Sequence, residues 1–163
     1  VPLVKKYNNL IVTMTFSKSR SMAGGRLGFG IANKEIIKDL NAVRFSTNPY
    51  NVNSMSMAAG IGLLEDRVIT EKNCRTIMEN RQYTTDALKK LGFETTDSLA
   101  NFIFVKHNGI DGETLYLKLK EQGVLVRHFK TEKIKDYNRI TIGTKKQMDI
   151  LINTIKEILE EIK

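Results

Sequence analysis

The sequence has very little cysteine and no long hydrophobic run. Cys74 is the only cysteine in 163 residues, so no internal disulfide can form, and a zinc site built from several cysteines is excluded. No apolar run approaches the roughly 20 residues that a membrane-spanning helix needs. Residues 1–10 also lack the basic-then-apolar order of a secretory signal. We therefore expect a cytoplasmic protein with no membrane partner.

Motifs for nucleotide and metal binding are missing as well. Gly28-Phe29-Gly30 is not followed by the third glycine of a dinucleotide loop, and no Gly-Lys-Ser/Thr phosphate loop is present. His107 and His128 are isolated in the sequence, and single histidines of this kind are more often surface or packed residues than ligands. We predict no bound metal.

Acidic residues are outnumbered by basic ones. The chain has 26 Lys and Arg against 18 Asp and Glu, which gives a formal net charge of +8. Because clustered basic side chains attract phosphate, a noncatalytic module that binds anions or nucleic acid is one interpretation. The sequence contains no basic run or aromatic-interleaved stripe, however, so lysines spread over solvated helix faces explain the charge better. We predict no nucleic-acid partner.

Hydrophobic periodicity predicts alternating strands and helices. Apolar and β-branched runs predict strands at 9–16, 26–32, 99–106, 124–129 and 139–142. Helical spacing predicts helices at 34–43, 52–64, 70–91 and 112–122, and a C-terminal helix whose apolar face runs from Met148 to Ile162. Asn33 is the expected N-cap of the first helix, and Gly92 and Gly123 are the expected C-caps of the third and fourth. The Asn-rich turn at 47–53 is the expected boundary between two units.

The loop between the first two predicted strands carries the candidate chemistry. It reads TFSKSRSMAG from Thr15 to Gly24, with Lys18 among hydroxyl side chains and Arg26 eight positions later. Hydroxyls of Thr15 and Ser17 can donate to phosphate oxygens, and the guanidinium of Arg26 matches two such oxygens at once. An isolated Ser-Lys pair is usually an exposed loop, but the complete pattern favours a phosphate ester held beside an amine.

This loop resembles, position by position, the lysine attachment site of the class II pyridoxal-phosphate-dependent aminotransferases. The rest of the chain is similar to the histidinol-phosphate aminotransferases among them. Arg20 and Ser21 depart from many members, which have an aromatic or aliphatic residue and a glycine there. These departures weaken the subfamily assignment more than cofactor binding. The landmarks that carry the resemblance lie, in the expected order, at residues 9–12, 26–29, 49–53, 100–102, 123–127 and 139–144.

The resemblance implies an α/β fold, namely the C-terminal part of a fold type I aminotransferase. Residues 1–48 would end the large cofactor-binding domain, 49–92 would form connecting helices, and 93–163 would form a small α+β C-terminal domain. Most of the large domain would lie upstream of Lys18, including the acidic partner of the pyridine nitrogen. We therefore expect these 163 residues to be inactive by themselves.

The resemblance also assigns roles to six side chains. Pyridoxal 5'-phosphate is the implied cofactor. It would be attached to Lys18, which would act as general base and acid, and its phosphate would be anchored by Thr15, Ser17 and Arg26. Arg127 and Arg139 would meet anionic groups of the substrates, although solvated arginines on a strand edge are the alternative interpretation.

The implied reaction is amino transfer between L-histidinol phosphate and 2-oxoglutarate, a step of histidine biosynthesis. The resemblance implies that the full-length protein is a homodimer, with a small-molecule amino donor and a 2-oxo acid as substrates. Two alternatives of the same fold stay open: another class II aminotransferase, acting on aromatic amino acids, and a phosphothreonine decarboxylase.

Overall fold

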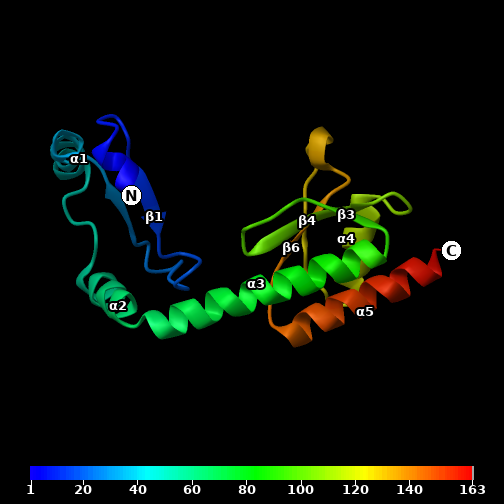
Figure 1. Ribbon diagram of the computed structural model, residues 1–163. Helices are drawn as coiled ribbons and strands as arrows, with labels where there is room; N and C mark the ends of the chain where they lie inside the picture. Colours follow the sequence, from blue (N-terminus) through cyan, green and yellow to red (C-terminus); the bar gives the residue numbers. More distant parts are fainter. Residues whose placement is uncertain (163) are drawn as a thin grey trace. The chain divides into compact units, whose positions relative to one another are not determined.

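The computed structural model describes residues 1–162, which form strands and helices in nearly the order that the sequence predicts (Figure 1). The chain divides into two compact units, the first spanning Val1–Asn73 and the second beginning at Cys74. This division falls inside helix α3 (Arg67–Lys90), so α3 contributes residues to both units. The domain boundaries expected after residues 48 and 92 stay a prediction.

The first unit begins with a short 3-10 turn, η1 (Pro2–Lys5), and an antiparallel hairpin. Strand β1 (Val12–Thr15) pairs with β2 (Gly28–Ile31), with Thr15 opposite Gly28. The N–H of Phe16 donates to the carbonyl of Leu27 at 3.0 Å, which continues the pairing by one residue on each side. The hairpin therefore presents residues 17–26 as its connecting loop.

Two helices follow the hairpin in this unit. Helix α1 (Lys34–Thr47) begins at Asn33, whose side chain accepts a hydrogen bond from the N–H of Ile36 at 2.9 Å, as expected for an N-cap. It runs four residues past the predicted end at 43, and in its last turn the hydroxyls of Ser46 and Thr47 donate to the carbonyls of Ala42 and Val43, each at 2.8 Å. Helix α2 (Ser54–Glu65) begins at Asn53, which caps it in the same way.

The second unit is a four-stranded antiparallel sheet with helices. The strands are β3 (Phe93–Thr95), β4 (Phe102–His107), β5 (Arg127–His128) and β6 (Asn138–Thr141), in the spatial order β3-β4-β6-β5. Helix α4 (Gly112–Glu121) lies between β4 and β5 in sequence, a short 3-10 turn, η2 (Glu132–Ile134), lies between β5 and β6, and α5 (Lys145–Glu161) follows β6. In Figure 1, α5 runs beside the C-terminal part of α3, and the hydroxyl of Tyr83 donates to Asp149 at 2.7 Å between the two helices.

Two strands differ from the prediction made from the sequence. Strand β3 was not predicted, because three residues are too few to establish an alternating pattern. Strand β5 is only two residues long, where the apolar run predicted 124–129. The N–H of Val124 instead donates to the carbonyl of Leu119 at 2.8 Å, and Gly123 adopts a φ of 77°, so the run is used to close α4.

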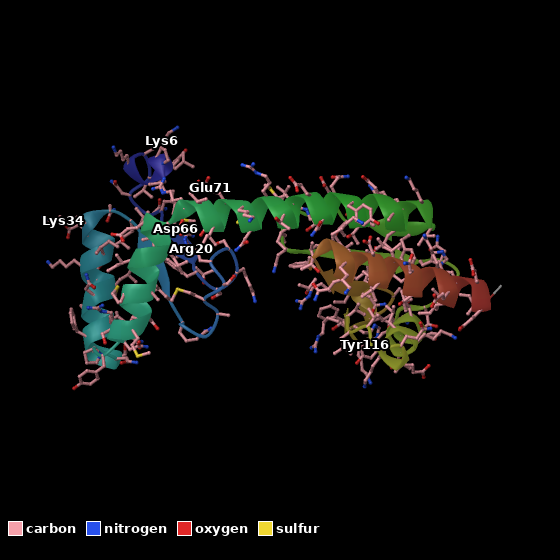
Figure 2. The ribbon with its side chains drawn as sticks, turned by 90° about the horizontal axis from the view of Figure 1, so that it is seen from below. Lys6, Arg20, Lys34, Asp66, Glu71 and Tyr116 are labelled. Atoms are coloured by element: carbon pink, nitrogen blue, oxygen red, sulfur yellow. The ribbon has the colours of Figure 1, made fainter. Side chains whose placement is uncertain are left out.

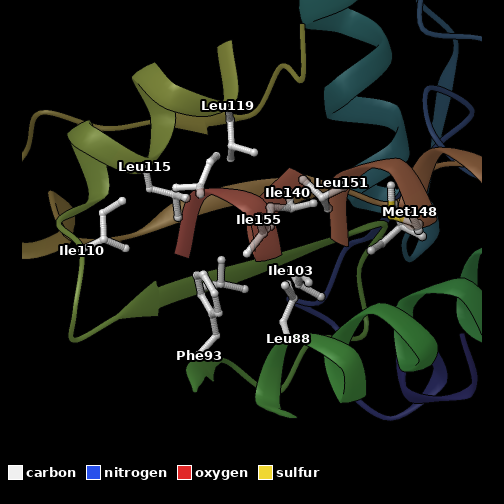
Figure 3. Packing of buried hydrophobic residues seen from close by; sticks show 13 residues of the cluster. Leu88, Phe93, Ile103, Ile110, Leu115, Leu119, Ile140, Met148, Leu151 and Ile155 are labelled. Carbon is white, nitrogen blue, oxygen red and sulfur yellow. The ribbon is translucent and has the colours of Figure 1, made fainter. Parts of the chain in front are cut away.

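One hydrophobic core fills the second unit. Figure 3 shows Leu88 of α3, Ile103 of β4, Ile140 of β6 and Ile155 of α5 converging between the helices and one face of the sheet. These four side chains are at most 2% exposed. The apolar face predicted for the last helix is therefore the face that α5 buries, and a capping box of Thr144 and Gln147 fixes where this helix begins.

Residues 1–162 contain neither a candidate membrane-spanning helix nor a candidate metal-binding cluster. No helix in this range combines the length and apolar character needed to cross a bilayer. Within the same residues, histidine, cysteine, aspartate and glutamate side chains do not gather in a group of three that could hold a metal ion.

Replacing Ile155 with alanine should destabilise the second unit by about 2–5 kcal/mol, because a fully buried side chain leaves a cavity when it is truncated. Ile150→Ala on the same helix is the matched control, since Ile150 is 50% exposed and its truncation should change stability by less than about 1 kcal/mol. Denaturant unfolding of the natural protein measures both. Equal effects of the two substitutions would contradict the placement of the core.

Candidate active site

The hydroxyl groups of Thr15 and Ser17 are brought together at the end of β1. Their oxygens lie 2.8 Å apart, and the N–H of Ser17 donates to the hydroxyl oxygen of Thr15 at 3.1 Å. Alternation along the strand puts both side chains on one face of the hairpin. Lys18 follows at once in a turn that is closed by a hydrogen bond of 3.1 Å from the N–H of Ser21 to the carbonyl of Lys18. The lysine is exposed.

Arg26 lies opposite Ser17 at the other end of the loop. The hairpin pairing continues through Phe16 and Leu27, so Ser17 and Arg26 are the next residue on each strand. Arg26 has a φ of 49°, the left-handed region that residues with a side chain rarely adopt. Such backbone strain of about 1–3 kcal/mol often marks functional sites. The guanidinium bonds only weakly within the loop, donating to the carbonyl of Ala23 at 3.3 Å.

Positive charge on this hairpin has no acidic counterpart in the surrounding sequence. No aspartate or glutamate occurs before Glu35. Uncompensated cations attract anions, and backbone and hydroxyl donors beside them supply hydrogen bonds to the anion's oxygens. The loop thus has the donor set of a phosphate site, with a primary amine within it. The cations of this segment are Lys5, Lys6, Lys18, Arg20, Arg26 and Lys34.

Arg20, labelled in Figure 2, is one of the two residues, with Ser21, at which the loop departs from many class II aminotransferases. Its guanidinium carbon lies 5.0 Å from the centre of the Phe16 ring, a cation–π arrangement. Its Nε is buried and has no hydrogen-bond partner in residues 1–162. Arg20 therefore packs over Phe16 and adds to the positive charge beside Lys18.

The loop is anchored to helix α2 by the residues that flank it. Phe16 and Leu27 are 3% and 8% exposed, although most of this hairpin is open to solvent. They pack where α2 has Gly60: a Cβ there would collide with Leu27 Cδ2 and would lie 3.8 Å from the ring of Phe16. Glycine at position 60 thus permits the close approach that fixes both ends of the loop.

In the second unit, Arg127 and Arg139 are direct cross-strand neighbours. They are register partners on β5 and β6, so their side chains project from the same face of the sheet. Like charges placed opposite each other destabilise a sheet. No salt bridge joins either guanidinium to a carboxylate among the described residues, and Arg139 Nε is buried without a hydrogen-bond partner there. This arrangement suits an anionic ligand.

Aromatic rings support the two arginines on that face. The guanidinium carbon of Arg139 lies 5.3 Å from the ring centre of Phe102, and that of Arg127 lies 5.6 Å from the ring centre of Phe129. Phe104, two residues along β4 from Phe102, stacks on Tyr137 at 4.8 Å. The opposite face carries the core residues, so aromatic rings and guanidinium groups share the face that the helices leave open.

A third cation on the same face is neutralised. Lys106 forms an ion pair with Glu94 at 3.1 Å, and the hydrogen bond and charge of that carboxylate raise the pKa of Lys106. Lys106 thus has a carboxylate partner on the neighbouring strand, whereas Arg127 and Arg139 have none within residues 1–162. Of these three cations, the two arginines have no salt bridge within residues 1–162 and are available to another anion.

Comparison with known proteins identifies the family of this chain. The family model described as aminotransferase class I and II matches residues 1–155. The chain belongs to this aminotransferase family. The resemblance inferred from the attachment loop is confirmed at that level, and so is the α/β class of the fold.

Individual relatives agree with the assignment. The chain is 47% identical over 158 residues to a histidinol-phosphate aminotransferase of Brachyspira hyodysenteriae, a match that covers 97% of this chain and 45% of the relative. Among solved structures, the histidinol-phosphate aminotransferase of Clostridium acetobutylicum superposes with a TM-score of 0.87 at 26% identity, over 98% of this chain and 48% of that one. The L-threonine-O-3-phosphate decarboxylase of Porphyromonas gingivalis superposes with a TM-score of 0.81 at 26% identity, over 96% and 49%. This aminotransferase chain thus spans about half the length of the curated relative.

The predicted site residues of this aminotransferase fall into two groups, one in each unit. Thr15, Ser17, Lys18 and Arg26 lie on the hairpin loop of the first unit, and the arginine pair lies on the sheet of the second. Their roles in binding and catalysis stay predictions.

The aromatic face beside the arginine pair was not predicted from the sequence. The run FIFV at 102–105 contained a signal for it: four consecutive apolar residues in a predicted strand place apolar side chains on both faces of the sheet.

Gly60→Ala should disturb the lysine loop, because the added methyl group displaces Leu27. We expect a destabilisation of about 1–3 kcal/mol. Gly62→Ala is the matched control: it lies on the same helix, meets nothing within 4 Å, and should stabilise α2 by about 0.5–1 kcal/mol. Thermal unfolding of the natural protein compares the two. A Gly60→Ala protein as stable as the control would refute this packing.

Proposed function

We propose that this chain forms the lysine-bearing loop and C-terminal region of a pyridoxal-phosphate-dependent aminotransferase. The proposed reaction is amino transfer between L-histidinol phosphate and 2-oxoglutarate. The observation that carries the proposal is the loop from Thr15 to Arg26, where one amine lies among hydroxyl donors and a strained arginine with no acidic residue nearby in sequence. An anionic, amine-reactive cofactor fits that donor set.

Each loop residue has a distinct task in this proposal. The hydroxyls of Thr15 and Ser17 donate to phosphate oxygens of the cofactor, and the guanidinium of Arg26 supplies a charged, forked donor to the same group. Lys18 provides the covalent attachment. When bound, the cofactor's pyridine ring takes up the electrons released at the substrate Cα. The amine of Lys18 would act as general base and acid for the proton at the substrate Cα.

The arginine pair of the second unit is proposed to bind substrate anions. L-Histidinol phosphate carries a phosphate and 2-oxoglutarate carries carboxylates, and guanidinium groups form paired hydrogen bonds with either. Neither Arg127 nor Arg139 shares a salt bridge within residues 1–162, so no bridge of that kind has to break when the substrate binds. The same pair can thus serve both halves of the reaction.

The choice of amino donor is supported by the relatives. The curated relative that is 47% identical and the Clostridium acetobutylicum structure are both histidinol-phosphate aminotransferases. The Porphyromonas gingivalis neighbour is an L-threonine-O-3-phosphate decarboxylase of similar fold. A phosphothreonine decarboxylase is therefore the second candidate, and an aromatic aminotransferase is the third. A cytoplasmic homodimer remains part of the proposal.

Attachment of the cofactor at Lys18 is open to a direct chemical test. Borohydride reduction of the natural protein with pyridoxal phosphate, followed by peptide mass mapping, should place a reduced pyridoxyl group on Lys18. Lys18→Ala should abolish the adduct and lower amino transfer by about 10²- to 10⁴-fold, the usual contribution of a general acid–base group.

Lys34→Ala is the control for this experiment, because Lys34 is an exposed lysine of the same acid-free segment at the start of α1. It should leave both the adduct and the activity unchanged. Adducts scattered over several lysines, or activity that survives in Lys18→Ala, would refute the role of Lys18.

The donor is tested by comparing kcat/KM for L-histidinol phosphate, L-phenylalanine and O-phospho-L-threonine in the natural protein. Loss of the contact between a phosphate and the arginine pair should cost the phenylalanine reaction about 10-fold or more, given about 1.5–3 kcal/mol for hydrogen bonds to charged groups. Preference for phenylalanine would favour the aromatic aminotransferase. Release of carbon dioxide from phosphothreonine would favour the decarboxylase.

A further inference from the structure

We propose that Asn80 and Arg81 of helix α3 are positioning residues for Arg139, an inference that rests on the proposed binding of substrate anions by the arginine pair. Neither residue lies on the open face of the sheet or carries a role in the resemblance. Both reach out of their helix to backbone carbonyls at the ends of the strands that carry Phe102 and Arg139.

The two contacts come from consecutive residues. Asn80 Nδ2 donates to the carbonyl of Gly143 at 2.8 Å, just after β6, and Arg81 Nη1 donates to the carbonyl of Ala100 at 2.8 Å, just before β4. Asn80 is only 7% exposed and Arg81 is half-buried. The next polar side chain, Gln82, instead donates within the helix to Asp86.

The two segments held in this way are joined to each other. The N–H of Ile142 donates to the carbonyl of Asn101 at 2.9 Å, which links the end of β6 to the start of β4. Ser98 braces the same place by donating from its hydroxyl to the carbonyl of Phe102 at 2.6 Å. Helix α3 therefore fixes one corner of the sheet through two carbonyls.

Phe102 and Arg139 are set by that corner. Phe102 is the first residue of β4, directly after the held segment, and its ring supports the guanidinium of Arg139 at 5.3 Å. Arg139 Nε is buried without a hydrogen-bond partner in the described part of the chain, and its guanidinium packs against this ring. A shift of the corner would move the ring and re-aim the guanidinium, which weakens binding of an anion without touching the chemical step.

The experiment replaces the guanidinium of Arg81 while keeping its apolar stem. In the natural full-length enzyme, Arg81→Met should raise KM for L-histidinol phosphate about 2- to 30-fold, the range for substitutions that act through a neighbour, with kcat within about twofold. Arg81→Lys should restore most of the affinity, because an ammonium can still donate to the Ala100 carbonyl. Gln82→Ala is the control on the same helix and should leave KM unchanged.

A double-mutant cycle shows whether Arg81 acts through Arg139. In an Arg139→Ala background, Arg81→Met should raise KM no further, because the side chain it positions is gone. An undiminished effect in that background would overturn the proposal, as would an unchanged KM in Arg81→Met or equal losses in Arg81→Lys and Arg81→Met.

The pyridoxyl adduct on Lys18 and the amino transfer of the unsubstituted enzyme are measured in the same preparations. Absence of both in the unsubstituted enzyme would overturn the proposed function together with this inference. An active enzyme whose Arg81 variants have normal KM would overturn only the positioning role.

Discussion

Two groups of basic side chains, one on the hairpin and one on the sheet, have no salt-bridge partner within residues 1–162, and the structure around each group holds its side chains in position. On the hairpin, Lys18, Arg20 and Arg26 share a sequence segment with no acidic residue. On the sheet, Arg127 and Arg139 face the same side as cross-strand partners without a salt bridge in residues 1–162. Like charges held close together raise the energy of a folded chain, so each group favours the binding of an anion beside it.

Packing explains how a largely exposed loop keeps its shape. The segment that carries the amine is ten residues long, yet the residues that flank it, Phe16 and Leu27, are buried against α2 beside Gly60. The left-handed backbone at Arg26 then turns the chain at the phosphate-binding position. A tight, strained connection between two anchored strand ends keeps donors preorganised, which matters because reorganisation at the moment of binding would weaken the site.

Much of the fold could be predicted because its elements follow simple periods. The last helix was clear from its apolar face, and Asn33, Gly92 and Gly123 act as the caps that their residue types indicate. One error came from a tertiary effect: Val124 and Val126 pack on the core and Val124 closes α4, and an apolar run of this kind cannot be distinguished from a strand by its pattern.

The lysine loop could be predicted because its residues are contiguous. Arg127 and Arg139 were each predicted as binding residues from the sequence. That they are cross-strand neighbours depends on the register of β5 and β6, which no local pattern supplies. The supporting rings come from separate segments, Phe102 from β4 and Phe129 from just after β5, and were missed for the same reason. Contacts from α3 to Ala100 and Gly143 span 19 and 63 residues and leave no mark in the sequence.

The most direct measurement is a crystal structure of the natural protein grown with pyridoxal phosphate. The account predicts continuous density from Lys18 Nζ to the cofactor, with the phosphate within hydrogen-bonding distance of the Ser17 hydroxyl and the Arg26 guanidinium. A phosphate bound away from these two side chains, or a cofactor joined to a different lysine, would contradict it.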